Sequence, residues 1–293
     1  MYFEKIVILG TGKLALDCAN HVKQIGIDYE LFDMNEIQMD RMEKMSKSKE
    51  LNYYHLEKQK TMNQLRKQES QLLLVSAINP CIIPKDILEK KNIIAVNCHQ
   101  ALLPRHPGRN AEAWAIYEQD KASGITWHYM TSAVDEGDIL VQKEISLKEN
   151  TTSFQLFRQQ MDSAFEGFRE LLEMIEAGPC KGIRQLRREK GKLHYSWEIP
   201  NDGYLNIYWN PEKISAFLRA MDYSALKVLG EWKVIYEGME YAFSKYKIQK
   251  LDKKVIGFQC VMDGDTLIVE KEMYRFYCKN CKMIQQQKVK NIG

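Results

Sequence analysis

Asn97 and His99 place a carboxamide and an imidazole two positions apart, and Asp135 adds a carboxylate in an Asp-x-Gly sequence further along the chain. The apolar run 92–96 leads directly into Asn97 and predicts a β-strand. Alternate side chains of a strand point to the same face, so Asn97 and His99 share one face. Open α/β sheets place their chemistry at the carboxyl ends of such strands. These three residues are therefore the candidate catalytic group.

The strands and helices that position this group can be predicted from patterns of apolar residues. Apolar runs predict strands at 5–9, 29–32, 72–76, 92–97, 125–130 and 138–145. Helical spacing predicts helices at 14–25, 86–90, 114–119 and 154–177. The alternation predicts an α/β fold with a Rossmann-like, mostly parallel sheet and helices on both faces.

The composition changes near residue 181 and predicts a second, smaller domain. The stretch 181–192 is basic and punctuated by glycine, which is typical of a linker. Beyond it, a helix is expected at 212–221. Short β-like runs follow at 232–236, 254–260, 266–269 and 274–277. We therefore expect a catalytic domain over 1–180, a linker over 181–203 and a small β-rich, OB-like domain over 204–293.

The bulk properties are those of an ordinary globular protein and exclude several classes. With 293 residues and a formal net charge of +3, the chain has an ample core and implies no strong polyanion partner. The seven cysteines are scattered without a disulfide framework, as suits a reducing cytoplasm. The chain starts with a strand, leaving no room for a signal peptide, and no apolar run approaches membrane-spanning length. A cytoplasmic location without membrane attachment is expected.

Four segments together carry a resemblance to a known family. They are Asn97 to Pro104, Pro107 to Asn110, Gly124 to His128, and Asp135 to Gly137. In this combination they resemble the 10-formyltetrahydrofolate-dependent formyltransferases, over roughly the first two-thirds of the chain. These segments most resemble those of the members that formylate small amines. The family also includes methionyl-tRNA formyltransferase. Ala101 departs from the pattern, since many relatives carry Ser there.

The resemblance implies transfer of a formyl group from 10-formyltetrahydrofolate to the primary amine of an amino sugar nucleotide or an amino acid. Asn97 and His99 would donate hydrogen bonds to the oxyanion of the tetrahedral intermediate. Asp135 would hydrogen-bond the imidazole or a bound water and collect the proton released by the amine. No metal is expected, because the formyl donor is already an activated amide.

The resemblance also implies where the two substrates lie. The expected folate-binding residues are Ser76, Ile83, Pro84, Leu103, Pro104, Val134 and Gly137. The expected acceptor-binding residues are Arg105, His106, Arg109 and Asn110, with Arg109 able to pair with a carboxylate or phosphate. His128, on a strand, is expected to support the site rather than to react. Cys98 points to the opposite face of its strand and is expected to pack in the core.

Other functions compete with this one. Methionyl-tRNA is the second acceptor, and the basic stretch 181–192 could grip its backbone. The charges of 33–50 are mixed, however, and a phosphate-binding surface needs a basic excess. A non-catalytic folate-binding module and a homodimer built by the C-terminal domain are also compatible with the sequence.

A dinucleotide-binding oxidoreductase is suggested by Gly10-Thr11-Gly12 followed by Asp33 about 20 residues later. That reading leaves the candidate catalytic group unexplained, so we favour close helix packing as the role of these glycines. Cys278 and Cys281 have the spacing of a zinc half-site. No second ligand pair lies near them, so two unlinked thiols are the favoured interpretation.

Overall fold

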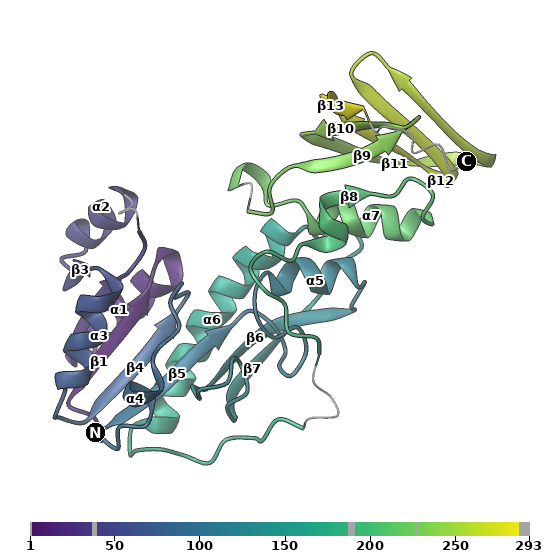
Figure 1. The fold of residues 1–293 in the computed structure, drawn as a ribbon. Coiled ribbons are helices and arrows are strands. Elements are labelled where there is room, and N and C mark those ends of the chain that lie inside the picture. The colour runs from purple at the N-terminus through teal and green to yellow at the C-terminus, as the bar shows by residue number, and fades with distance from the viewer. Residues whose placement is uncertain (1, 37–39, 187–190, 227, 287–293) are drawn as a thin grey trace, which may run out of the picture. The chain divides into compact units, whose positions relative to one another are not determined.

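The computed structural model describes residues 2–36, 40–186, 191–226 and 228–286, and the chain forms two compact units (Figure 1). The first unit comprises 1–109, 122–146 and 157–194, and the second comprises 110–121, 147–156 and 195–293. This division differs from the three consecutive segments expected from the sequence. The first unit continues past residue 180 to 194, and two internal segments belong with the C-terminal part.

The first unit is built on one seven-stranded sheet with the order β3-β2-β1-β4-β5-β6-β7. Its strands are β1 (Lys5–Gly10), β2 (Asp28–Asp33), β3 (Tyr53–His55), β4 (Leu72–Ala77), β5 (Ile93–His99), β6 (Ala122–Tyr129) and β7 (Ile139–Ser146). The strands from β3 to β5 pair in parallel, whereas β6 and β7 are antiparallel to their neighbours. The expected mostly parallel sheet is confirmed, and only the short β3 was not predicted.

Helices cover both faces of this sheet, as expected. They are α1 (Gly12–Gln24), α2 (Asp40–Ser48), α3 (Lys58–Lys67), α4 (Lys85–Leu88) and α6 (Ser153–Ile175), of which residues 157–175 lie in the first unit. Alternate residues of β1 enter two separate cores. Ile8 packs in a cluster with Leu16 of α1 and Phe168 of α6, while Val7 packs in another with Met62 of α3. The sheet is therefore buried on both sides.

Gly10, at the end of β1, is required by close packing. A Cβ at this position would lie 1.8 Å from the carbonyl oxygen of Ala77 on β4. Asp33 is fully buried and already paired: its Oδ1 accepts from the Asn35 amide nitrogen at 3.1 Å, and its Oδ2 accepts from the Tyr53 hydroxyl at 3.3 Å. Both features of the dinucleotide fingerprint thus have structural roles, which favours the packing interpretation.

The second unit combines two helices with two β-sheets around its own core. The helices are α5 (Ala111–Tyr117) and α7 (Pro211–Ala220). Asn210 caps α7 by accepting a hydrogen bond from the Lys213 amide nitrogen at 2.8 Å, and Pro211 occupies the first turn, where a missing N–H costs nothing. α5 was expected in the catalytic domain, but it belongs to this unit.

The strands of the second unit form two separate sheets. One sheet has the order β13-β10-β9-β8, and β11 and β12 form a two-stranded ribbon. These strands are β8 (Tyr204–Leu205), β9 (Trp232–Tyr236), β10 (Met239–Phe243), β11 (Lys245–Asp263), β12 (Thr266–Lys279) and β13 (Lys282–Gln286). The runs expected at 266–269 and 274–277 are parts of one strand. The four-stranded sheet and the separate two-stranded ribbon confirm the expected β-rich character, but they differ from an OB fold, which is a five-stranded barrel.

Within the described residues, no helix is both long and apolar enough to cross a membrane.

Candidate active site

The pairing of β5 with β6 gathers four polar side chains on one face of the sheet. Asn97 lies opposite His128, and His99 lies opposite Thr126. Residues directly opposite each other in an antiparallel pair point to the same face. Cys98, between the two catalytic candidates, faces the other way and packs in the core, which confirms its expected role.

Asp135 meets this face from the loop between β6 and β7. Its Oδ2 lies 3.4 Å from Nδ1 of His99, and its Oδ1 lies 3.5 Å from Nδ2 of Asn97 and 3.4 Å from Nε2 of His128. The Gly108 amide nitrogen donates to Oδ2 at 2.8 Å. The structure thus brings the three candidate catalytic residues together around one carboxylate that is 9% exposed.

The electrostatics of the pair hold Asp135 as an anion. Burial by itself would raise the Asp135 pKa, but the imidazole of His99, contacts from His128 and the Gly108 amide together hold the pKa well below its ordinary range. Burial lowers the His99 pKa, and this effect outweighs the opposing influence of Asp135 and of the His106 carbonyl. His99 is therefore neutral near pH 7 and able to accept a proton.

The second ring nitrogen of His99 is also occupied. Nε2 lies 2.8 Å from the carbonyl oxygen of His106. A carbonyl oxygen only accepts, so Nε2 carries the hydrogen in this contact. In the neutral ring, Nδ1 then presents a lone pair to Asp135. Protonation of Nδ1 would convert that contact into a charge-assisted hydrogen bond.

Thr126 fixes the turn that follows β5. Its hydroxyl donates to the Ala101 carbonyl at 2.7 Å and accepts from the Leu103 amide nitrogen at 3.1 Å. Gln142 on β7 donates to the Leu103 carbonyl at 2.9 Å. The hydrogen bond from Thr126 reaches the backbone carbonyl of Ala101, so it forms whether residue 101 is Ala, as here, or Ser, as in many relatives.

The residues expected to bind folate come from the carboxyl ends of neighbouring strands and the loops beyond them. Ser76, the next-to-last residue of β4, lies beside Asn97 and is buried. Val134 is 45% exposed in the loop before Asp135, whereas Ile83 is only 3% exposed and packs in the core. Ile82, which the sequence interpretation did not select, is 73% exposed. The open apolar side chains of these loops are therefore Ile82 and Val134.

The remaining expected folate-binding positions have clear backbone roles. Leu103 is 3% exposed and held by Thr126 and Gln142. Pro84 precedes the first turn of α4. At Gly137, a Cβ would lie 1.7 Å from the Tyr129 carbonyl oxygen, so only glycine lets the loop pack here.

The residues expected to bind the acceptor are not all brought to the site. Arg105 and Arg109 are exposed on the first unit. The His106 ring is buried and stacks on His194 at a centroid distance of 6.0 Å, so only its carbonyl meets His99. Asn110 belongs to the second unit, where it precedes α5 with φ 56°.

The described part of the basic stretch 181–192 is not a free linker. Ile183 exchanges two backbone hydrogen bonds of 2.8 Å with Ile139 at the start of β7. The carboxamide of Gln185 donates to the carbonyl oxygens of Asp135 and Gly137. Sequence reasoning missed this contact because a polar side chain in a basic, glycine-containing stretch carries no signal of its partner. Residues 187–190 lie outside the described residues.

Cys278 and Cys281 lie in the second unit, where Cys278 is fully buried in the core. The Cys281 thiol donates to the Cys278 carbonyl oxygen at 3.2 Å. Burial raises the pKa of the Cys278 thiol, so this sulfur is held in its neutral form.

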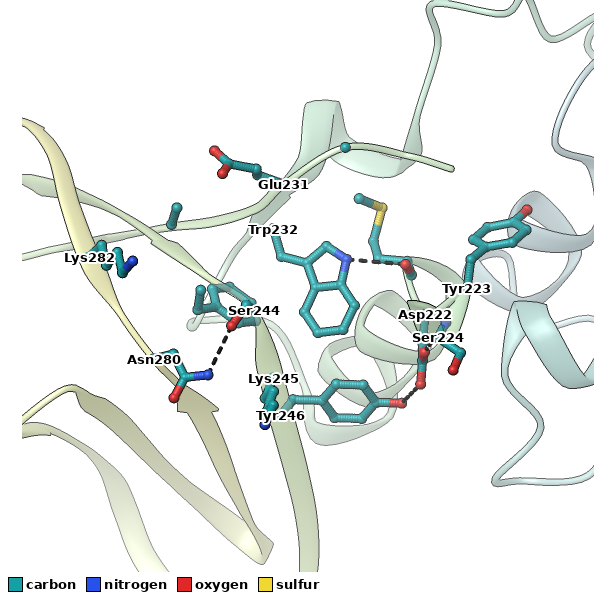
Figure 2. A pocket seen from close by; sticks show the side chains of 14 residues that line it. Asp222, Tyr223, Ser224, Glu231, Trp232, Ser244, Lys245, Tyr246, Asn280 and Lys282 are labelled. Carbon is teal, nitrogen blue, oxygen red and sulfur yellow. Dashed lines mark hydrogen bonds between the residues drawn. The ribbon is translucent and has the colours of Figure 1, made fainter. Parts of the chain in front are cut away.

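A cavity of about 650 Å³ lies within the second unit (Figure 2). Trp232 donates through Nε1 to the Met221 carbonyl oxygen at 3.1 Å, and the Tyr246 hydroxyl donates to Asp222 at 2.9 Å. Its lining includes none of the candidate catalytic residues. The acid–base arrangement of the Asp135 cluster therefore makes that cluster, and not the cavity, the candidate active site.

Comparisons with known proteins identify the family. A family model described as formyl transferase matches residues 17–172. GDP-perosamine N-formyltransferase of Brucella melitensis is 32% identical over 51% of this chain and 56% of its own length. Methionyl-tRNA formyltransferase of Clostridioides difficile is 26% identical over 59% of this chain and 60% of its own length. The chain thus spans little more than half the length of the curated relatives it matches.

Solved structures share the fold. The N-formyltransferase of Helicobacter canadensis, in complex with folinic acid and dTDP-3-aminofucose, superposes with a TM-score of 0.74 at 12% identity, covering 94% of this chain and 99% of that one. A 4-N formyltransferase of Francisella tularensis gives 0.66 at 16% identity, covering 81% and 94%. The family model spans more than half of the sequence and includes all three candidate catalytic residues, and the chain belongs to the formyl transferase family.

Proposed function

We propose that this protein transfers the formyl group of 10-formyltetrahydrofolate to the primary amine of a small-molecule acceptor, an amino sugar nucleotide or an amino acid. The proposal rests on one observation: the side chains of Asn97 and His99 both lie beside the buried carboxylate of Asp135. An amide donor, a neutral imidazole and an anion are the groups that an acyl transfer to an amine requires.

The oxyanion that forms during attack needs hydrogen-bond donors. Nδ2 of Asn97 lies 3.1 Å from Nε2 of His128 and 3.5 Å from Oδ1 of Asp135. The Asp135 contact is at the long limit of a hydrogen bond, so this amide hydrogen is the one that turns to the oxyanion. His99 reaches the oxyanion only by releasing the His106 carbonyl. A preorganised donor in such a site contributes about 3–4 kcal/mol to transition-state stability.

The proton released by the amine must also be taken up. The low pKa of Asp135 makes its carboxylate a weak resting place for that proton, whereas the neutral His99 ring has an accepting nitrogen directed at Asp135. We assign the final position of the proton to Nδ1 of His99, with Asp135 stabilising the charged ring.

The residues at the loop ends fit a folate. The pterin is a flat ring with polar edges, and these loops combine exposed apolar side chains with backbone groups. Ile82 and Val134 offer the apolar surface, and Ser76, near the end of β4, lies beside Asn97. When bound, 10-formyltetrahydrofolate supplies the formyl carbon as an activated amide.

Two acceptor classes have support. An amino sugar nucleotide is favoured by the match to GDP-perosamine N-formyltransferase and by the likeness to sugar N-formyltransferase structures. Methionyl-tRNA is the second candidate, because several matching relatives are methionyl-tRNA formyltransferases. The net charge of +3 gives little drive toward a polyanion, which places the small amine first.

The test is a transfer assay with 10-formyltetrahydrofolate and a panel of amino sugar nucleotides, amino acids and charged initiator tRNA. Gain of one formyl group by a small amine, read by mass spectrometry, is expected. The same mixtures with the His99→Asn variant or without folate are the controls. Formylation of the tRNA alone would move the function to the second candidate, and no product with any amine would reject the proposal.

A further inference from the structure

Residues 180–186 and 191–194, here called the strap, lie against the first unit rather than leading away from it. Tyr129 anchors its start, since the Tyr129 hydroxyl donates to the Cys180 carbonyl at 2.8 Å and accepts from the Cys180 amide nitrogen at 2.9 Å. A Cβ at Gly182 would lie 2.7 Å from the Cβ of Asp138. The strap therefore packs tightly beside the loop that carries Asp135.

Gln185 makes the most direct contact between the strap and that loop. Its Nε2 donates to the Asp135 carbonyl oxygen at 2.9 Å and to the Gly137 carbonyl oxygen at 2.7 Å. One carboxamide thus uses both amide hydrogens on backbone acceptors within three residues of each other. These distances are those of well-formed hydrogen bonds.

The Asp135 loop needs support of this kind. Asp135 has φ 54°, in the left-handed region that costs a non-glycine residue free energy. The segment 130–138 contains no helix or strand that would hold the backbone by itself. Contacts from outside the loop must therefore hold the carboxylate at His99.

The end of the strap holds the second loop that reaches the site. The Gly191 amide nitrogen donates to the Pro104 carbonyl, and the His194 amide nitrogen donates to the Pro107 carbonyl, at 2.8 and 2.9 Å. The His106 carbonyl that meets His99 lies between these points, and the Gly108 amide that meets Asp135 follows Pro107 directly. Both loops around the carboxylate are thus held by one segment.

We propose that Gln185 is a positioning residue that holds the backbone of the Asp135 loop so that the carboxylate faces His99. Gln185 hydrogen-bonds the backbone of Asp135 and Gly137, so it acts on the reaction only through the position of the Asp135 carboxylate. The kinetic consequence rests on the proposed function, whereas the structural consequence does not.

The kinetic test uses two substitutions with different chemistry. Gln185→Ala removes both hydrogen bonds and lowers kcat by about tenfold to a hundredfold, with a smaller change in the KM for the amine. In Gln185→Glu, the ionised carboxylate has no hydrogen to donate to the carbonyl oxygens of Asp135 and Gly137. The protonated carboxyl group can donate one hydrogen bond to them. The ratio of Gln185→Glu to wild-type kcat therefore rises as the pH is lowered from about 8 to about 5.5, and it rises more than the ratio for Gln185→Ala, which has no titrating group at this position.

A second readout is independent of activity. Asp135 raises the pKa of the His99 ring against the effect of burial. If Gln185→Ala lets the carboxylate move away, the His99 pKa falls further below its ordinary value, as measured by NMR titration of the ring. This titration decides the positioning role even if the wild-type protein transfers no formyl group to any acceptor, so the two proposals fail separately.

Leu186→Ala is the matched control, because Leu186 is the next residue and its side chain is 45% exposed. Its kcat and His99 titration should equal those of the wild type. Thermal unfolding checks that each variant is folded, and if Gln185→Ala does not fold, the pH dependence of Gln185→Glu decides. A folded Gln185→Ala protein with unchanged kcat and unchanged His99 titration, or a Gln185→Glu ratio that does not vary with pH, would overturn the proposal.

Discussion

At the scale of single residues, the candidate site depends on the charge states of Asp135 and His99. Asp135 is held as an anion, and His99 is kept neutral by burial while a carboxylate faces its Nδ1. The pair is therefore prepared to receive one proton. This arrangement distinguishes an acid–base site from a buried ion pair that serves stability alone.

Replacing either Asp135 or His99 should remove the ability of the pair to receive the proton. Asp135→Asn and His99→Asn are each expected to lower kcat by at least about a hundredfold, because each loses an interaction made mainly in the transition state. Folate binding, measured separately by fluorescence titration, should persist. Turnover close to the wild-type level in either variant would exclude that residue from catalysis.

The same pair predicts how stability depends on pH. The folded His99 has a pKa below its ordinary value of about 6.5, so the unfolded chain binds the proton more readily. This contribution to stability is present above about pH 6.5 and is lost as the pH falls toward the folded pKa, with a slope of at most about 1.4 kcal/mol per pH unit. Denaturant unfolding from pH 7.5 to 5.5 should therefore show a steeper loss for the wild type than for His99→Asn. Parallel curves for the two proteins would contradict this.

At the scale of secondary structure, the register between strands decides which side chains meet. The pairing of β5 with β6 places His128 opposite Asn97 and Thr126 opposite His99. All four side chains therefore point to the same face of the sheet. The period of two within each strand was readable from the sequence. The register between the strands was not, because it depends on the whole sheet.

The turn from β1 to α1 gives a test at this scale. Gly10→Ala is expected to destabilise the protein by about 3 kcal/mol or more, since the added Cβ meets the Ala77 carbonyl. Gly12→Ala is the comparison: its Cβ would have open space, and only its φ of 73° makes the change unfavourable, by about 1 kcal/mol. Equal losses in the midpoint of denaturant unfolding would show that Gly10 is not a packing position.

At the scale of the whole molecule, the chain consists of two units, and the candidate site lies entirely in the first. The second unit has its own hydrophobic core and its own cavity. We expect it to contribute to acceptor choice or self-association rather than to the chemical step, because none of the acid–base groups described at the site comes from it.

Ligand binding separates the proposed function from the oxidoreductase alternative. The protein is expected to bind a tetrahydrofolate analogue and to show no binding of NAD(H) in a fluorescence titration. The physical reason is that Gly10 and Asp33 are already engaged in packing and hydrogen bonds. Tight NAD(H) binding, with none for the folate analogue, would revive the dehydrogenase reading. The Asp135→Asn variant should behave like the wild type in both titrations.

The sequence alone predicted the mostly parallel sheet, its helices α1, α4 and α6, and the candidate residues Asn97, His99 and Asp135, because these depend on local periodicity and on motifs of fixed spacing. It predicted a supporting role for His128 without its contact with Asp135, and it did not predict that Gln185 would hold the Asp135 loop. The Gln185 contacts join residues 48 and 50 positions apart in the chain, and no local pattern encodes them. The second unit shows the same division of information. Its β-rich character was evident from side-chain type, whereas the four-stranded sheet and the separate ribbon follow from which strands find partners once the chain has folded.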